Sequence, residues 1–267
     1  MRYFLHLAYN GCNYRGWQRQ LSAVSVQECL ENALSQIFKQ KITCIGCGRT
    51  DAVVHAIQYF VHFDLENDFD FDLLFRLQKT LPHDIVVFDV FIMINGAEHA
   101  RYDAVERTYN YFIHTNLDPF LHTVSSYYDA SFLDLNSMKE ALLLLLKYND
   151  FAAFCLTPDK HNTTLCKITA VQLYTNKNNN RFRIEISANR FLKGMIRIIV
   201  GKLLEIGAGR LTIGEFEELF ISKNRAKIMN SAYPQGLYLS KIRYPYLDIP
   251  IKTEFWNIFN GIEWVEV

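Results

Sequence analysis

The chain has 267 residues, half of them hydrophobic and 14% aromatic, which is enough for one large domain or two moderate ones with a buried core. Its 28 Lys and Arg balance 28 Asp and Glu, so a generally basic nucleic-acid coat is excluded and any RNA contact must come from local clusters. No uncharged apolar run reaches about 18 residues. We expect no signal peptide and no membrane span, and therefore a protein of the reducing cytoplasm.

The first hundred residues predict one layer of strands with helices packed on it. Short apolar or alternating segments predict strands at 3–9, 42–47, 57–65 and 85–91. A helix reaching Phe38 follows the capping box formed by Ser25 and Glu28. A second helix is predicted from Asp70 until Pro82 stops it.

After a polar segment at 95–105 the pattern restarts. Strands are expected at 108–115, 167–175, 181–188 and 236–242, the middle two as a hairpin. Capping boxes at Ser137-x-x-Glu140 and Thr212-x-x-Glu215 predict helices, and a further helix is predicted from Phe191 to about residue 206.

These elements predict an α+β protein of two similar lobes with a cleft between them. We expect the first lobe to span 1–97 and the second 98–245. Residues 246–267 would form a tail that packs on the body or at a dimer interface, and the roles of its Trp256 and Trp264 stay open.

A short polar turn, Gly-Arg-Thr-Asp-Ala at 48–52, joins two of the predicted strands. It would hold Arg49 and Asp51 at the rim of a sheet, where reactive groups are often found. On position alone, Asp51 is more typical of an Asx turn or a surface ion pair than of a nucleophile. The turn is therefore a candidate site that needs further support.

The loop at 12–20 interleaves Arg15 and Arg19 with Trp17. Bases stack on aromatic rings while guanidinium groups meet phosphates, so this pattern suits nucleic acid. A tryptophan that plugs the core beneath the loop explains it equally well.

Arg197 stands inside an apolar run of the helix predicted from Phe191, on one stripe with Arg190, Lys193 and Gly201. The stripe is either the solvated face of a half-buried helix or the sign of an inward arginine, which requires a partner. Asp51 is a candidate, because a neighbouring guanidinium would keep its carboxylate ionised as a nucleophile requires.

Metal ligation is only weakly indicated. Cys44 and Cys47 form one close pair, whereas zinc takes four ligands, so two buried small residues are the simpler interpretation. His55, His62 and Asp64 could form a set, although zinc ligands usually group more tightly. We expect neither a metal nor an organic cofactor.

Six segments with distinctive motifs follow one another along most of the chain. They are Gly-Trp-Gln-Arg-Gln at 16–20, Gly-Arg-Thr-Asp-Ala-Val-Val-His-Ala at 48–56, His-Ala-Arg at 99–101 with Arg-Thr-Tyr-Asn-Tyr at 107–111, Asn-Asp-Phe-Ala-Ala-Phe at 149–154, Asn-Arg-Phe-Leu-Lys-Gly-Met-Ile-Arg at 189–197, and Gly-Leu-Tyr-Leu at 236–239. Together these segments resemble the motifs of the tRNA pseudouridine synthase A family.

The resemblance implies a homodimer of two-lobed protomers, each lobe a mostly antiparallel sheet backed by helices. It implies isomerisation of uridine to pseudouridine in the tRNA anticodon stem-loop at positions 38–40, without a cofactor. Asp51 corresponds to the catalytic aspartate and Arg49 to the neighbour that displaces and holds the base. Tyr109 corresponds to the active-site tyrosine that stacks on the base, and Arg197 to the partner of Asp51. Further RNA contacts are expected from Arg15, Arg19, Arg101, Arg107, Lys193 and Lys202.

Val53 stands where the family has glycine. If the backbone there needs a positive φ, a β-branched residue is costly, and a catalytically impaired RNA-binding protein of the same fold is the alternative. A hydrolase using Asp51 would need a second carboxylate or a His–Asp pair to activate water, and the sequence points to neither. The presence of Asp51, Tyr109 and Arg197 together favours the synthase.

Overall fold

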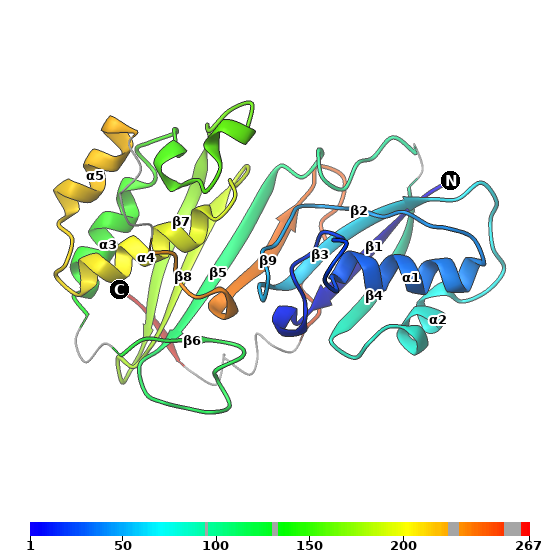
Figure 1. Ribbon diagram of the computed structural model, residues 1–267, viewed down its shortest axis with the longest axis horizontal. Helices are drawn as coiled ribbons and strands as arrows, with labels where there is room; N and C mark the ends of the chain where they lie inside the picture. The colour runs from blue at the N-terminus through cyan, green and yellow to red at the C-terminus, as the bar shows by residue number, and fades with distance from the viewer. Residues whose placement is uncertain (94–95, 130–132, 224–229, 254–262) are drawn as a thin grey trace. The chain divides into compact units, whose positions relative to one another are not determined.

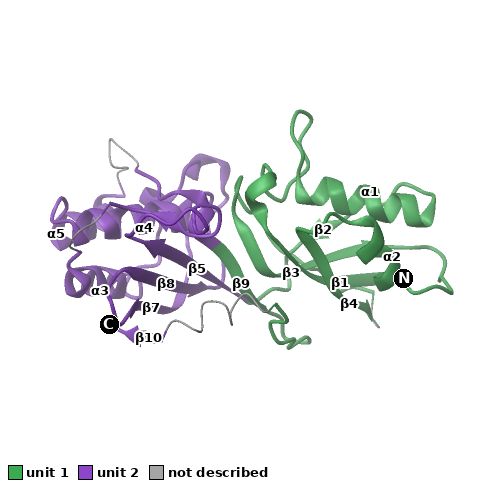
Figure 2. Cartoon of the chain, turned by 90° about the horizontal axis from the view of Figure 1, so that it is seen from below, with its two compact units in different colours: residues 1–105, 238–255 green, residues 106–237, 256–267 purple. Residues whose placement is uncertain are grey.

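The computed structural model describes residues 1–93, 96–129, 133–223, 230–253 and 263–267 (Figure 1). The chain divides into two compact units, 1–105 with 238–255 and 106–237 with 256–267 (Figure 2). Both combine a mainly antiparallel sheet with helices, which confirms the α+β class. Across the described ranges, we find no helix with the length and apolar character needed to cross a membrane.

The sheet of the first unit is centred on β1 (Arg2–Tyr9), which pairs antiparallel with β3 (His55–Asp64) and β4 (Ile85–Met93). A two-residue strand, β2 (Ile45–Gly46), is all that forms of the strand expected at 42–47, and it also pairs with β3. Strand β9 (Leu237–Arg243) pairs in parallel with the beginning of β3. The last long strand in the sequence therefore lies beside the strand that follows the candidate turn.

Helices α1 (Val26–Phe38) and α2 (Leu73–Thr80) complete the first unit. Ser25 caps α1 by accepting a hydrogen bond from the Glu28 N–H, as expected, while the Glu28 carboxylate lies 3.5 Å from Arg19. Helix α2 begins later than predicted, because Asp72 rather than Asp70 is its N-cap. Phe38 packs 6.2 Å from Phe63 of β3, so α1 covers the sheet face that carries Phe63.

Residues 244–252 cross the opposite face of this sheet, which carries Phe60 because side chains alternate along a strand. The Tyr244 ring meets Phe60 edge-to-face at 5.4 Å. The Gln58 side chain donates to the Ile249 carbonyl at 2.9 Å, and the Lys252 ammonium lies 2.5 Å from Asp89. This part of the expected tail therefore packs on the first unit.

The second unit is built on the strand order β10-β7-β8-β5. Strand β8 (Arg181–Ala188) pairs antiparallel with β5 (Glu106–His114) and β7 (Ile168–Asn176), and β10 (Trp264–Glu266) pairs antiparallel with β7. A short strand, β6 (Ser126–Tyr127), runs parallel to β5. The predicted hairpin is confirmed.

Trp264 belongs to β10 and has its ring 6.3 Å from Phe112 and 5.4 Å from the Arg183 guanidinium. It packs on the second unit, whereas Trp256 lies outside the described residues.

Three helices accompany this sheet: α3 (Leu135–Leu144), α4 (Met195–Gly207) and α5 (Ile213–Ser222). The Thr212–Glu215 capping box is confirmed. The box at Ser137 is wrong, because Asp134 is the N-cap and accepts hydrogen bonds from both the N–H and the hydroxyl of Ser137. Each of the two side chains could have capped the helix, and the earlier one does.

Helix α4 begins four residues later than predicted. Gly194 precedes it with φ of +74°, so the chain at 191–194 is not helical. Glycine adopts this left-handed conformation without strain, and a Cβ at the position would also lie 2.6 Å from the Leu156 side chain. The late start places Arg197 in the first turn of the helix.

Candidate active site

The candidate turn leads directly into β3. The Val54 N–H donates to the Asp51 carbonyl at 3.2 Å, so residues 51–54 form a β-turn. Arg49 is exposed, Asp51 is half-buried, and Thr50 between them is buried. The turn therefore leaves the guanidinium and part of the carboxylate open to solvent, while Thr50 between them faces the core.

Two buried tyrosines form hydrogen bonds with Gly48 and Thr50, the residues on either side of Arg49. The Tyr59 hydroxyl donates to the Gly48 carbonyl at 2.5 Å. The Tyr9 hydroxyl and Thr50 Oγ1 are hydrogen-bonded at 2.8 Å. The backbone N–H of Trp17 donates to the Thr50 carbonyl at 3.3 Å. Nothing in the sequence marked Tyr9 and Tyr59 as part of the site, because each reads as an ordinary strand aromatic.

The backbone of the loop at 9–17 is in close contact with the backbone of residues 50–54. A Cβ on Gly11 would stand 2.1 Å from the Val54 carbonyl oxygen, and one on Gly16, whose φ is +87°, would stand 2.3 Å from the Thr50 carbonyl oxygen. Trp17 is 3% exposed and its ring is 4.4 Å from that of Tyr59. Of the two interpretations of Trp17, the core plug is therefore correct.

Val53 has φ of +67° and its N–H donates to the Tyr14 carbonyl at 3.1 Å. The position thus requires the left-handed conformation that the comparison with glycine suggested. A β-branched side chain is disfavoured there, so the backbone next to Asp51 is strained.

We expect Val53→Gly to raise the free energy of unfolding by about 1 kcal/mol, because relief of the left-handed strain outweighs the extra chain entropy of glycine. Urea titration with constant m-value would measure this. Ala52→Gly is the matched control and should lower the free energy of unfolding, by about 0.5–1 kcal/mol. A loss of stability in both variants would contradict the strain.

Tyr109 and Arg197 both lie in the second unit. Tyr109, on β5, is 9% exposed and meets Phe191 edge-to-face at 5.1 Å. The Arg197 side chain is half-buried and its Nε–H donates to the Ala232 carbonyl at 2.7 Å. A Cβ on Gly201 would lie 2.0 Å from the Asn230 carbonyl oxygen, so the chain at 230–232 runs close along this face of α4.

The six basic residues expected to contact RNA differ in exposure. Arg15, Arg19, Arg101 and Lys193 are exposed, whereas Arg107 is half-buried. Arg19 pairs with Glu31 at 3.0 Å, Arg107 donates to the Asn189 carbonyl at 2.9 Å, and Lys202 pairs with Glu205 at 2.7 Å. Lys202 is also buried. Arg15 adjoins the candidate turn, because the residue before it accepts the Val53 hydrogen bond.

Arg101 belongs to a loop that is fixed by buried side chains. His62 Nδ1 accepts a hydrogen bond from the Ala100 N–H at 3.1 Å, and the Tyr244 hydroxyl donates to the Ala100 carbonyl at 2.5 Å. Next to it, the guanidinium of Arg101 lies 5.7 Å from the ring of Tyr102, which is 75% exposed. The loop therefore presents a cation and an aromatic ring together.

The histidine and carboxylate set considered for a metal is engaged elsewhere. His55 Nδ1 accepts from the Gly11 N–H at 3.1 Å, and Asp64 pairs with Arg2 at 2.8 Å. Within the part of the chain that the structure describes, no three His, Cys, Asp or Glu side chains are grouped to hold a metal. Cys44 and Cys47 are buried, as the simpler interpretation proposed, and Cys47 Sγ accepts a hydrogen bond from the Phe60 N–H at 3.4 Å.

Burial, with the charge of Arg2 as a further cause, lowers the pKa of His62 to about 4. In the unfolded chain the imidazole has a pKa near 6.5, so between about pH 6.5 and 4 it is protonated there but neutral in the folded protein. The free energy of unfolding should therefore fall as pH drops through this range. We expect His62→Asn, which retains an acceptor for the Ala100 N–H, to reduce this loss by an amount on the order of 3 kcal/mol. Urea titrations at pH 7 and 4.5 would measure it, and equal losses in both proteins would contradict it.

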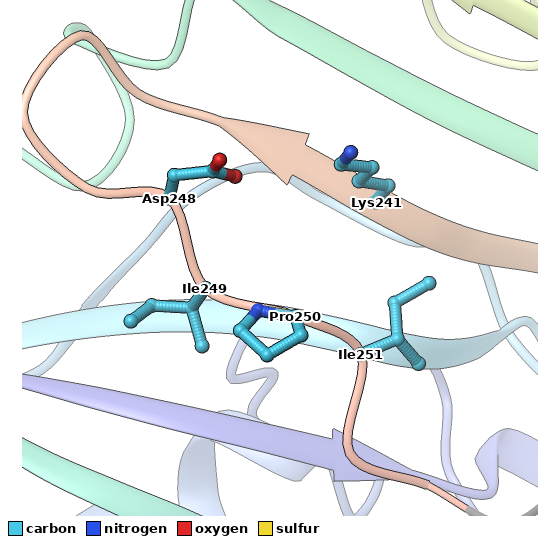
Figure 3. Close-up of a pocket in the computed structure, with 5 residues that line it drawn as sticks. All are labelled: Lys241, Asp248, Ile249, Pro250 and Ile251. Carbon is cyan, nitrogen blue, oxygen red and sulfur yellow. The ribbon is translucent and has the colours of Figure 1, made fainter.

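A hollow of about 310 Å³ lies between the end of β9 and the segment that crosses the sheet (Figure 3). Its lining residues are Lys241, Asp248, Ile249, Pro250 and Ile251. None of the predicted site residues belongs to it, so the candidate site is defined by the turn rather than by this hollow.

Comparison with known proteins identifies the family. A model described as tRNA pseudouridine synthase matches residues 146–245. The tRNA pseudouridine synthase A of Porphyromonas gingivalis is 39% identical over 91% of this chain and 97% of its own length. The chain belongs to the tRNA pseudouridine synthase family. The synthases A of Bacteroides fragilis and of a Thermoanaerobacter species agree, at 40% identity over 91% of the chain and 37% over 88%. The resemblance inferred from the motifs is thereby confirmed, and with it membership of a family of isomerases.

Proposed function

We propose that this protein isomerises uridine to pseudouridine in the anticodon stem-loop of tRNA, at positions 38–40, with Asp51 as the catalytic group. The observation that carries the proposal is the turn at 48–51, in which Thr50 is buried and bonded to Tyr9 while Arg49 is exposed and Asp51 is only half-buried. The relatives named tRNA pseudouridine synthase A support tRNA as the substrate. They give no support to the alternative of an RNA-binding protein without activity.

The reaction breaks the bond between N1 and the ribose, turns the base and forms a bond from C5 to the same ribose carbon. C5 then loses its proton to solvent and N1 takes one up, so the product is an isomer and no redox partner is needed. A uridine within a stem must be flipped out to be reached, and Arg49 would hold the displaced base. Asp51 acts in its ionised form, as a nucleophile or as a base on the ribose.

The second unit would supply the remaining groups. Tyr109 is proposed to stack on the flipped base, close to where the proton leaves C5, and Arg197 to pair with Asp51 and keep it ionised. Arg15, Arg101 and Lys193, whose side chains are exposed, are the best candidates for phosphate contacts, so binding should weaken as salt rises. Like the family it resembles, we infer that the protein works as a homodimer in the cytoplasm.

The target positions are tested with tRNA transcripts labelled with tritium at uracil C5, because isomerisation releases that tritium to water. We expect release from a transcript with uridine at positions 38, 39 or 40, and none when cytidine replaces uridine at all three. Base-paired partners are changed to match, so that the stem stays intact. Release from the triply substituted transcript would place the target elsewhere, and no release from any transcript would refute the activity.

A further inference from the structure

We propose that the hydroxyl groups of Tyr9 and Tyr59 are positioning groups, which fix the turn at 48–51 so that Arg49 and Asp51 keep the geometry needed for reaction. This inference rests on the proposed role of Asp51. It assigns a function to two buried residues that do not reach the substrate and that would otherwise belong only to the core.

The two hydroxyls form hydrogen bonds with the turn on either side of Arg49. Tyr59 Oη meets the carbonyl of Gly48, and Tyr9 Oη meets the side chain of Thr50. The rings that carry them are 5.5 Å apart, edge-to-face, on the adjacent strands β1 and β3. Because both rings are packed in the sheet, these hydrogen bonds attach the turn to a rigid element rather than to another loop.

The first of these contacts requires glycine in β2. A Cβ on Gly46 would lie 2.3 Å from Tyr59 Oη and 2.6 Å from the Trp17 ring, so any side chain would block the path of the hydroxyl to Gly48. Tyr9 and Tyr59 are 4% and 0% exposed. A buried hydroxyl is tolerated only when it is hydrogen-bonded, and a phenylalanine would fill either space without that requirement.

The backbone that follows this turn, at Val53, is strained. Val53 is held in the left-handed region by its hydrogen bond to the Tyr14 carbonyl. A strained backbone relaxes into other conformations unless its surroundings fix it. The two tyrosine hydroxyls hold residues 48 and 50, and so limit how far relaxation at Val53 would displace Asp51.

Tyr9→Phe and Tyr59→Phe test the proposal, because each removes one oxygen and keeps the ring. We expect kcat for tritium release to fall about 10- to 100-fold, as a displacement near 1 Å does in other sites, with KM for tRNA changed less than about threefold. Hydrogen exchange of a peptide covering 48–54 should become faster in both variants. Tyr3→Phe is the matched control: its ring is buried in the same strand and its hydroxyl bonds Asp68 at 3.0 Å, away from the turn.

The outcomes separate this inference from the proposed function. Faster exchange at 48–54 with a fall in kcat, both absent in Tyr3→Phe, supports the positioning role. Unchanged exchange, or faster exchange with unchanged kcat, overturns it, and so does an equal fall in kcat in Tyr3→Phe. Asp51→Asn is assayed alongside: if it keeps full activity, the role of Asp51 is refuted, and the exchange measurements still decide whether the hydroxyls fix the turn.

Discussion

Asp51→Asn is expected to lower tritium release from tRNA by about 10³-fold or more, because the amide can neither attack the ribose nor accept a proton. The variant should fold normally. Asn can make the same local hydrogen bonds in a turn as Asp, and the side chain is only half-buried. Binding of tRNA should change by no more than a few-fold, so the loss should fall on kcat. Single-turnover release, with the enzyme in excess over labelled tRNA, measures this directly.

Glu66→Gln is the control for the charge change, because Glu66 is an exposed carboxylate at the far end of β3. It should keep full activity. If Asp51→Asn retained more than about a tenth of the wild-type rate, Asp51 would not be the catalytic group, since general acid–base or nucleophilic roles contribute at least 10²-fold.

The elements that could be predicted are those whose signal is local. Alternation identified the long strands, and the Thr212 box identified the first residue of α5. The first residue of a helix was predicted wrongly where two local signals competed, as in α3, or where a glycine left the helical conformation, as before α4. Asp134 and Ser137 are both good N-caps three residues apart. Helix α4 starts late because Gly194 takes a left-handed conformation, which the helical periodicity of the surrounding residues did not indicate.

The candidate site divides in the same way. Arg49 and Asp51 could be found together because one short turn carries both. Tyr9 and Tyr59 could not, since their role depends on hydroxyl contacts 41 and 11 residues away in the chain. Lys202 was expected at a phosphate and is instead buried beside Glu205, one turn further along its own helix. Its basic side chain alone suggested a phosphate contact, and the sequence did not show that the Glu205 carboxylate would pair with it.

Val53 is the instructive case. The sequence comparison with the family motif indicated a position that needs glycine, and the backbone there does have a positive φ. Val53 therefore adopts the left-handed conformation despite its β-branched side chain. Several contacts enforce it, among them the Tyr14 carbonyl and the close approach of Gly11 to Val54.

Arg197→Met is expected to lower kcat by about 10²- to 10³-fold, a loss typical of removing one preorganised charge from a site. Methionine keeps the length and the apolar contacts of the arginine stem but carries no charge. It also loses the hydrogen bond from Nε to the Ala232 carbonyl, which should cost about 1 kcal/mol of stability, measurable by urea titration. Arg210→Met, at an exposed position just beyond α4, is the matched control and should leave kcat unchanged.

The double variant Arg197→Met with Asp51→Asn decides whether the arginine acts through the aspartate. If Arg197 serves to keep Asp51 ionised, its loss has no further effect once residue 51 is neutral, and the double variant should be as slow as Asp51→Asn alone. Additive losses would instead assign Arg197 to the substrate. Arg197→Lys adds a second criterion, because lysine supplies the charge without the planar fork: partial recovery of kcat supports the ion pair, and none indicates that the guanidinium geometry is required.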